Sequence, residues 1–226
     1  ALQEQPFQQL LEVGPGGGAL TKYLLQIPAV NFKAVEVDQD KVDYLVQEYP
    51  SLKPQLIHQD FLQIPAPFEG LFTVVGNFPY NISSPILFHL LEWRHQLQSV
   101  VGMFQKEVAQ RVAAPHGSKT YGVLSVLIQA FFDVNYLFDV GEGCFTPPPK
   151  VKSGVIRLVP RAQPLSMKSE KSFKLLVKTA FNQRRKTLRN ACKPLFTADV
   201  LSDSIFLKRA EQLSVEDFAA LSFKMQ

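Results

Sequence analysis

Residues 10–19, Leu10-Leu11-Glu12-Val13-Gly14-Pro15-Gly16-Gly17-Gly18-Ala19, decide the class of fold. The apolar run at 10–13 is typical of a buried strand, and the pattern from 19 to 26 is typical of an amphipathic helix. Glycines between a strand and a helix let the backbone approach a ligand closely, and the helix N-terminus favours polar or anionic groups. This stretch therefore predicts a ligand-binding turn in an α/β fold.

The same alternation continues through the first two thirds of the chain. Apolar runs predict strands at 10–13, 32–37, 55–57, 71–75 and 100–104, and amphipathic patterns between them predict helices at 19–26, 40–49 and 84–93. Strands that alternate with helices indicate a parallel, doubly wound sheet. Two further helices are predicted at 106–112 and 121–131. The apolar segments 134–138 and 154–159 have no long helix between them, so we expect them to pair as an antiparallel edge.

The remaining pattern divides the chain into two domains. Phe145-Thr146-Pro147-Pro148-Pro149-Lys150-Val151 is too rich in proline for a helix or a central strand, and it predicts a stiff surface loop. Residues 160–169 resemble a linker, and the later pattern is helical, with Ser214 as N-cap of the last helix. We therefore expect an α/β domain over residues 1–160 and a small all-helical domain over residues 161–226.

Composition excludes several classes of protein. With 226 residues, 46% of them hydrophobic, the chain can bury a sizeable core. Two cysteines cannot build a disulfide framework, and four scattered histidines lack the spacing of a zinc site, so we expect a reducing compartment and no metal. No apolar run approaches the roughly 18 residues that a spanning helix needs. We expect a soluble, cytoplasmic protein without a membrane partner.

Positive charge is concentrated in the last third. Residues 151–226 hold 15 Lys and Arg against 6 Asp and Glu, whereas residues 1–150 hold 9 against 14. Such an excess indicates either a polyanionic partner or merely solvated helix faces. The densest cluster, which we predict to contact phosphates if the partner is a nucleic acid, is Arg184, Arg185, Lys186 and Arg189.

Polar residues follow the other predicted strands at the edge where the glycine turn lies. Glu36 ends the second strand near the spacing expected for an acid that binds a ribose, and Asp60 follows the third strand. With Ala19, the glycines also fit the dinucleotide pattern G-x-G-x-x-[GA]. These residues alone leave NAD and S-adenosylmethionine both open as cofactors.

The segment Asn77-Phe78-Pro79-Tyr80 after the fourth strand favours a methyl donor. An exocyclic adenine amine is a poor nucleophile, because its lone pair is delocalised into the ring, so an enzyme must hold both N–H groups with acceptors. The Asn77 side-chain oxygen and the carbonyl of Phe78, which Pro79 restricts to an extended conformation, can supply them. Tyr80 can stack on the base. A hydride-transfer enzyme would need none of these features.

The chain resembles the ribosomal RNA adenine N6-dimethyltransferases of the small subunit. The resemblance covers almost the whole sequence, through Glu12-Val13-Gly14-Pro15-Gly16, Val35-Glu36-Val37-Asp38, Gln59-Asp60, residues 76–83, residues 145–153, Phe181-Asn182-Gln183-Arg184-Arg185-Lys186-Thr187-Leu188 and Arg209-Ala210-Glu211-Gln212-Leu213. Each piece is weak alone, and the ordered set is highly specific. It implies a Rossmann-like methyltransferase sheet with a helical C-terminal domain.

The resemblance also implies roles for individual residues. Asn77, Phe78, Pro79 and Tyr80 would handle the target base. Lys150 and Phe181 are candidates for RNA contact beside the basic cluster; the alternatives are a solvated Lys150 and a Phe181 that belongs to the core. The substrate would be two adjacent adenosines in a hairpin loop near the 3′ end of small-subunit (16S) ribosomal RNA, each dimethylated during ribosome biogenesis. We expect the RNA to be recognised within an immature small subunit, and we take a monomer as the default oligomeric state. The S-adenosylmethionine site would comprise Glu12, Gly14, Gly16, Glu36, Asp60, Phe61 and Asn77.

Two departures from the family pattern and three alternatives accompany this interpretation. The sequence starts after the point where the family has a basic Gly-Gln-His-Phe-Leu-like segment, so we expect a truncated start. Phe78 stands where leucine is common, which should be a mild change because its proposed role belongs to the backbone. The alternatives are a large-subunit adenine dimethyltransferase, a non-catalytic ribosome-assembly factor and a transcription factor on the same fold.

Overall fold

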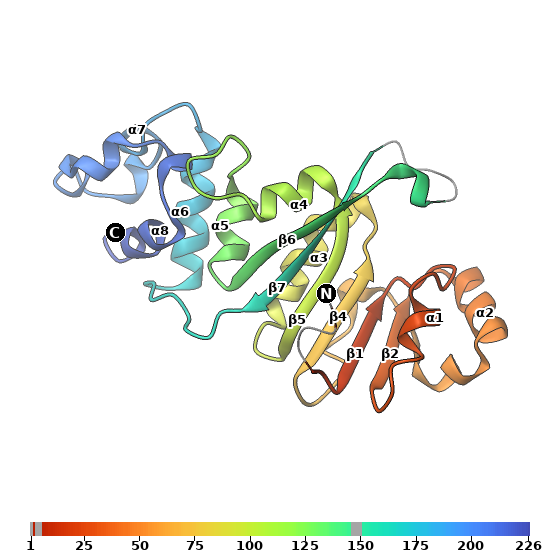
Figure 1. Ribbon diagram of the computed structural model, residues 1–226. Coiled ribbons are helices and arrows are strands. Elements are labelled where there is room, and N and C mark those ends of the chain that lie inside the picture. Colours follow the sequence, from red (N-terminus) through yellow and green to blue (C-terminus); the bar gives the residue numbers. More distant parts are fainter. Residues whose placement is uncertain (1, 3–5, 146–150) are drawn as a thin grey trace. The chain divides into compact units, whose positions relative to one another are not determined.

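The computed structural model describes residue 2 and residues 6–145 and 151–226. Seven strands form one sheet in the order β3-β2-β1-β4-β5-β7-β6 (Figure 1). The strands are β1 (Gln9–Val13), β2 (Asn31–Glu36), β3 (Leu56–His58), β4 (Phe72–Asn77), β5 (Leu97–Gln105), β6 (Phe132–Val140) and β7 (Ser153–Pro160). Strands β1 to β5 pair in parallel, and β7 runs antiparallel to β5. The predicted α/β sheet and its edge pair are confirmed.

Strand β1 has β2 on one side and β4 on the other, so the direction in which strands are added reverses at β1. Val13, the last residue of β1, lies opposite Gly76 near the end of β4. In open α/β sheets, such a reversal separates the loops beyond the carboxyl ends of the two strands and leaves a crevice between them. The topology therefore places the glycine turn and the Asn77 segment on either side of one crevice.

The helices of the α/β part are α1 (Thr21–Leu24), α2 (Gln39–Glu48), α3 (Ser83–Glu92) and α4 (Lys106–Val112). Helix α2 begins where the Asp38 carboxylate accepts hydrogen bonds from the N–H groups of Asp40 and Lys41. Helix α1 is shorter than the sequence pattern predicts, because the chain around it is held by turns such as the bond from the Gln26 N–H to the Tyr23 carbonyl. The core beneath these helices contains Leu10, Leu24, Phe32, Ala34, Leu45, Leu52 and Val75.

The chain forms two compact units. The first is Ala1–Ala109 with Asp133–Pro160, and the second is Gln110–Phe132 with Arg161–Gln226. The sequence pattern assigned residues 110–132 to the first domain. The backbone explains the difference, because the Arg161 N–H donates to the Phe131 carbonyl and the Gly117 N–H donates to the Glu211 carbonyl, at 2.9 and 2.6 Å.

The second unit contains α5 (Val123–Gln129), α6 (Glu170–Asn182), α7 (Leu188–Ala191) and α8 (Val215–Ser222). Phe173, Leu176 and Val177 of α6 are buried, as is Phe218 of α8. Ser214 caps α8 as predicted, by accepting from the Asp217 N–H. The helical pattern between α7 and α8 gives four short 3₁₀ helices instead of α-helices: Lys193–Leu195, Val200–Ser202, Ser204–Leu207 and Ala210–Gln212.

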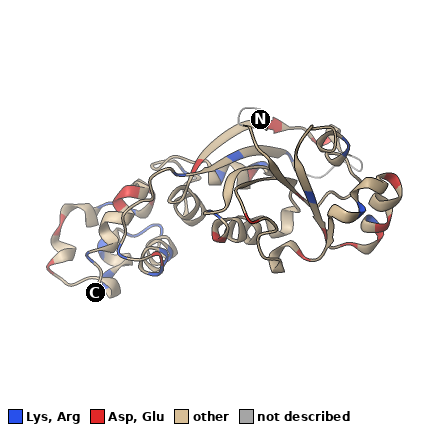
Figure 2. Ribbon diagram, turned by 90° about the horizontal axis from the view of Figure 1, so that it is seen from below, with Lys and Arg blue, Asp and Glu red and all other residues tan. Residues whose placement is uncertain are grey.

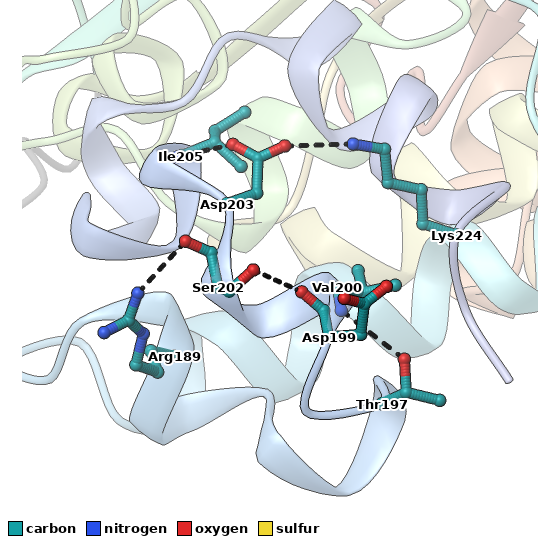
Figure 3. A network of polar contacts seen from close by, with 8 residues as sticks. All are labelled: Arg189, Thr197, Asp199, Val200, Ser202, Asp203, Ile205 and Lys224. Carbon is teal, nitrogen blue, oxygen red and sulfur yellow. Dashed lines mark hydrogen bonds and ion pairs between the residues drawn. The ribbon is translucent and has the colours of Figure 1, made fainter.

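Polar contacts hold two of these short helices in place, Val200–Ser202 and Ser204–Leu207 (Figure 3). Asp203 accepts from the Ile205 N–H at 3.1 Å, and its carboxylate pairs with Lys224 at the same distance. The Arg189 side chain donates to the carbonyls of Leu201 and Ser202, at 3.0 and 3.4 Å. N–H groups at a helix N-terminus and carbonyl groups at a C-terminus lack partners within the helix, so these bonds stabilise two segments that are too short to be stable by themselves.

The ring of Phe78 lies in a slot above two glycines of the sheet. Gly76 of β4 and Gly102 of β5 are paired residues in neighbouring strands. A Cβ atom on Gly76 would lie 2.9 Å from the Phe78 ring, and one on Gly102 would also overlap that ring. The Phe78 side chain is 1% exposed, and its N–H donates to the Met103 carbonyl at 3.1 Å. The phenyl ring and the two glycines therefore fit each other, which the sequence did not reveal.

We expect Gly102→Ala to destabilise the fold by about 1 to 3 kcal/mol, because the added methyl group overpacks the slot. Phe78→Leu in the same chain should recover part of this loss, since a leucine side chain leaves more room. Urea unfolding of the two single variants and the double variant measures the coupling. Gly141→Ala is the matched control, since a methyl group added there would meet no atom within 4 Å. Equal losses from Gly102→Ala in both backgrounds would contradict this packing.

Candidate active site

The carboxyl ends of β1 and β4 open on a cavity of about 740 Å³. Its floor and sides include Glu12 of β1, Gly14 and Gly16 of the turn that follows, and Asn77 of β4. The backbone at Gly14 and Gly16 has φ values of 66° and 55°, a conformation that favours glycine. This volume is in the range of small-molecule sites. Four of the predicted site residues are thus brought together around one cavity.

Glu12 is a buried carboxylate in the wall of this cavity. Its side chain is 1% exposed, and the Thr21 hydroxyl donates a hydrogen bond to it at 2.7 Å. Burial raises the pKa of Glu12 to about 7, the Thr21 hydrogen bond opposes the rise and the negative charge of Glu36 adds to it. A buried carboxylate whose hydrogen bonds come from one uncharged residue is poorly compensated. The site therefore favours a ligand that brings a positive group to Glu12.

Glu36 connects the glycine turn to the end of β2. Its carboxylate accepts from the Gly16 N–H at 3.0 Å and from the N–H groups of Val37 and Asp38 at 2.9 and 3.1 Å. The side chain is 8% exposed and is outside the group of residues that line the cavity. The structure thus shows Glu36 holding the turn in shape, while its contact with a ribose stays a prediction.

Asp60 and Phe61 follow β3, as the sequence pattern predicts. Asp60 caps the short 3₁₀ helix Phe61–Gln63 by accepting from the Leu62 N–H at 2.9 Å. The Phe61 ring is 6% exposed and contacts the rings of His89 and Trp93 edge-on, with centroids 5.0 and 5.2 Å away. In this structure both residues shape the edge of the sheet, and their contact with a cofactor stays a prediction.

The Asn77–Tyr80 segment presents different side chains in different directions. Asn77 and Pro79 are exposed, Phe78 is buried in its slot and Tyr80 is half-buried. The Tyr80 hydroxyl is within hydrogen-bond distance of the Ser153 hydroxyl, and the Tyr80 carbonyl accepts from Ser83. Asn77, at the end of β4, therefore lines the cavity as an exposed residue, while Phe78 and Tyr80 are anchored to the fold.

The strand pair β6–β7 contributes a wall that sequence reasoning missed. Phe138, Val140, Cys144 and Phe145 line the cavity together with Asn77. Phe145 is the first residue of the proline-rich segment, and that position was the available signal. Because the wall is apolar and includes an aromatic ring, it suits a flat, partly apolar group beside Asn77. Lys150 and the prolines at 147–149 lie outside the described residues, so the structure does not bear on their predicted role.

The predicted basic cluster lies in the second unit, whose ribbon carries several Lys and Arg positions (Figure 2). Its four residues differ in their surroundings. Arg185 and Lys186 are exposed. Arg184 is exposed as well, but it donates to the Lys119 carbonyl at 2.6 Å and lies 3.9 Å from the Glu211 carboxylate. Arg189 donates to the backbone carbonyls that end a 3₁₀ helix. The phosphate contacts predicted for these four residues stay predictions, and the structure favours Arg185 and Lys186 as the most available pair.

Two further cations adjoin this cluster. Thr187 and Arg209 form an isolated antiparallel bridge, and the Leu188 N–H donates to the Lys208 carbonyl at 2.9 Å. The bridge places exposed Lys208 and Arg209 beside the segment that carries Arg185 and Lys186. The linear sequence separates these groups by more than twenty residues, so its local charge density could not reveal the composite patch.

Phe181 lies among aromatic side chains of the second unit. Its ring centroid is 6.1 Å from that of Tyr121 and 5.9 Å from that of Phe218. Its side chain is partly buried. These contacts are those of a residue at the margin of a helical core, and its predicted contact with RNA stays a prediction.

No helix among residues 6–145 and 151–226 is long and apolar enough to cross a membrane. Over the same residues, no three His, Cys, Asp or Glu side chains gather into a set that could hold a metal ion.

Comparison with known proteins identifies the family. The model of the family described as "Ribosomal RNA adenine dimethylase" matches residues 1–224. The chain is 53% identical over 224 residues to "Ribosomal RNA small subunit methyltransferase A" of Flavobacterium johnsoniae, covering 97% of this chain and 85% of that protein. It is 46% identical over 231 residues to the protein of the same name from Porphyromonas gingivalis, covering 100% of this chain and 89% of that one.

Solved structures agree with this result. A dimethyladenosine transferase from Plasmodium falciparum has a TM-score of 0.78 at 26% identity, covering 93% of this chain and 86% of that one. The 23S rRNA methyltransferase ErmE has a TM-score of 0.71 at 23% identity, covering 96% and 93%, and it supports the fold alone. On this evidence, and with a cavity that suits a cationic ligand beside an exposed asparagine, the chain belongs to the ribosomal RNA adenine dimethylase family of S-adenosylmethionine-dependent methyltransferases.

Proposed function

We propose that this enzyme dimethylates the N6 atoms of two adjacent adenosines in the 3′-terminal hairpin loop of small-subunit ribosomal RNA. The observation that carries the proposal is the place of Asn77, which lines the same cavity as the glycine turn and Glu12. The relatives that are 46–53% identical carry the name of a small-subunit methyltransferase, which supports that subunit over the large one. An exposed Asn77 beside an intact glycine turn opposes a purely non-catalytic role.

The residues of the cavity fit the cofactor. S-adenosylmethionine, when bound, supplies a methyl group on a sulfonium that needs no further activation. Its cationic groups match Glu12, the one carboxylate among the residues that line the described cavity. The Gly14–Gly16 turn lets the backbone come close to the ligand. We assign Glu36 and Asp60, at the neighbouring strand ends, to the ribose and the adenine of the cofactor.

The Asn77–Tyr80 segment then acts on the target base. The Asn77 side-chain oxygen accepts a hydrogen bond from the adenine N6 amine, and the Phe78 carbonyl accepts the second. This pair favours a pyramidal nitrogen, whose lone pair is available for attack. The Tyr80 ring stacks on the base, and the apolar side of Phe145 excludes water from the reacting atoms. The methylated amine loses its extra proton to solvent, so the chain needs no dedicated base.

The basic patch of the second unit would bind the RNA backbone. We assign phosphate contacts to Arg185, Lys186, Lys208 and Arg209, with Arg184 and Arg189 contributing through their remaining N–H groups. RNA readout usually targets splayed single-stranded loops held by folded RNA. We therefore propose that the substrate is an immature small subunit, that one copy of the chain suffices, and that the enzyme works in the cytoplasm, where such subunits assemble.

Mapping of methylated adenines tests the proposed reaction. After incubation with unmethylated small subunits and labelled cofactor, mass spectrometry should find N6,N6-dimethyladenine at two adjacent positions of the 3′-terminal hairpin. Asn77→Ala should abolish transfer and change cofactor affinity less, as calorimetry would show. Asn31→Ala is the matched control, because Asn31 is exposed at the opposite end of β2. Label in large-subunit RNA, or turnover of Asn77→Ala within a few-fold of the parent, would refute the assignment.

The buried Glu12 predicts a pH-dependent stability without cofactor. Its folded pKa of about 7 exceeds the ordinary value of 4.5, so the folded state binds more protons than the unfolded state between these values. Stability from this group is complete below pH 4.5 and falls as the pH rises to about 7. Glu12→Gln should therefore match the parent near pH 4.5 and exceed it by about 2 to 3 kcal/mol at pH 8. Urea unfolding at both pH values checks this, and a pH-independent difference would contradict it.

Arg185→Ala with Lys186→Ala should weaken RNA binding and leave cofactor binding unchanged. The slope of log K against log salt should become shallower by about 0.7 to 0.9 for each phosphate that the variant no longer neutralises. Lys41→Ala with Lys53→Ala removes the same charge from exposed positions of the first unit and should leave the slope near that of the parent. An unchanged slope in the Arg185 and Lys186 variant would mean that this cluster is only solvated.

A further inference from the structure

Tyr80 is held at both ends by serine hydroxyls. The Ser83 hydroxyl donates to the Tyr80 carbonyl at 3.0 Å, and the Tyr80 hydroxyl lies 2.5 Å from the Ser153 hydroxyl. Ser83 is three residues away and belongs to the start of α3, whereas Ser153 is 73 residues away on β7. The first contact fixes the backbone of the turn. The second fixes the far end of the ring, and no step of the proposed reaction uses it.

Ser153 is itself held rigidly. It is the first residue of β7, its side chain is 0% exposed, and it lies opposite Gln105 in the antiparallel pair with β5. The carbonyl of Lys152, the residue before Ser153, accepts a hydrogen bond from the Lys106 N–H at 2.9 Å. The residue after Ser153 is Gly154, where an added Cβ would overlap the Tyr136 hydroxyl. The Ser153 backbone therefore has little freedom to move.

Hydrogen bonds around Tyr136, next to Gly154, also hold this part of the sheet in place. The Asp139 carboxylate accepts from both the Tyr136 hydroxyl and the Lys106 ammonium group. These hydrogen bonds lower the pKa of Asp139 below its ordinary value. These bonds thus link β6, which carries Tyr136 and Asp139, to Lys106 at the start of α4, directly after β5. Strand β7, which begins at Ser153, lies between β5 and β6 in the sheet.

A tyrosine ring rotates about two side-chain bonds, so a fixed backbone alone does not set the plane of the ring. A hydrogen bond at the hydroxyl, opposite the attachment point, sets the direction of the ring axis. A buried hydroxyl such as that of Ser153 also needs a partner, and Tyr80 is the partner that the structure shows. Two polar groups that satisfy each other across 73 residues specify one position of the ring.

We propose that Ser153 is a positioning residue that holds Tyr80 in the orientation for stacking on the target adenine. The proposal rests on the proposed function, in which Tyr80 contacts the base. Loss of the Ser153 hydroxyl would leave cofactor binding intact and let the ring take several directions. The second methyl transfer, to the bulkier N6-methyladenine, needs the more exact placement, so it should suffer more than the first.

Five variants test the proposal in the full chain: Ser153→Ala, Tyr80→Phe, the double variant of these two, and the isosteric pair Ser153→Thr and Ser153→Val. Ser153→Ala and Tyr80→Phe should each lower kcat by about tenfold, the effect of one lost hydrogen bond. The KM for S-adenosylmethionine should stay within about twofold. Monomethylated adenine should accumulate in both. The double variant should be no slower than the slower single variant, since both remove the same contact.

If Ser153→Ala does not fold, the comparison of Ser153→Thr with Ser153→Val still tests the proposal. Threonine and valine add the same volume at position 153 and differ in the hydroxyl group, so Ser153→Thr should retain more dimethylation than Ser153→Val at equal Tm. Equal rates and equal product ratios for these two variants would overturn the proposal, as would multiplied losses in the double variant. A parent enzyme that does not methylate the hairpin would instead refute the proposed function, so the two failures are distinguishable.

Discussion

The reversal of strand order at β1 is the constraint on which the site depends. Because β2 and β4 flank β1, the chain leaves the sheet in opposite directions from two adjacent strand ends, and a cavity of about 740 Å³ opens between them. The glycine turn occupies one side of the cavity and Asn77 the other. Neither the glycines nor the asparagine could form a site on a sheet whose strands were added in one direction only.

The two carboxylates at this edge of the sheet, Glu36 and Glu12, differ in how well hydrogen bonds compensate their charge. Glu36 accepts three backbone N–H groups, which compensate its charge in the absence of any ligand. Glu12 has hydrogen bonds from Thr21, and burial still raises its pKa to about 7. Glu36 therefore holds the turn in shape, whereas the buried carboxylate of Glu12 is stabilised by a nearby positive charge. A cationic methyl donor supplies that charge, whereas a dinucleotide with its phosphates would add to the negative charge.

Sequence reasoning predicted the parts of the structure that local pattern controls. The strands, the glycine turn, the cap of α8 and the edge pair followed from periodicity and residue type, and Asn77 followed from the chemistry of an adenine amine. Contacts between distant segments were beyond that reasoning. The Tyr80–Ser153 pair, the Phe145 wall and the bridge that brings Arg209 to Thr187 depend on how strands and loops meet in three dimensions. The 3₁₀ helices before α8 were not predicted either, because capping contacts at their ends determine whether they form.

The basic cluster shows why a count of charges overstates an interface. An arginine carries five N–H donors in a fixed fork, so it can hold the protein together and still face an anion. Arg189 uses its Nε and one Nη on the carbonyls that end a 3₁₀ helix, and that use ties its orientation to the fold (Figure 3). Removing such a residue would loosen the helical unit and weaken RNA binding together. Arg185 and Lys186 are exposed and carry no such structural bond among those described, so a change in salt dependence on their removal reports on phosphate contacts alone.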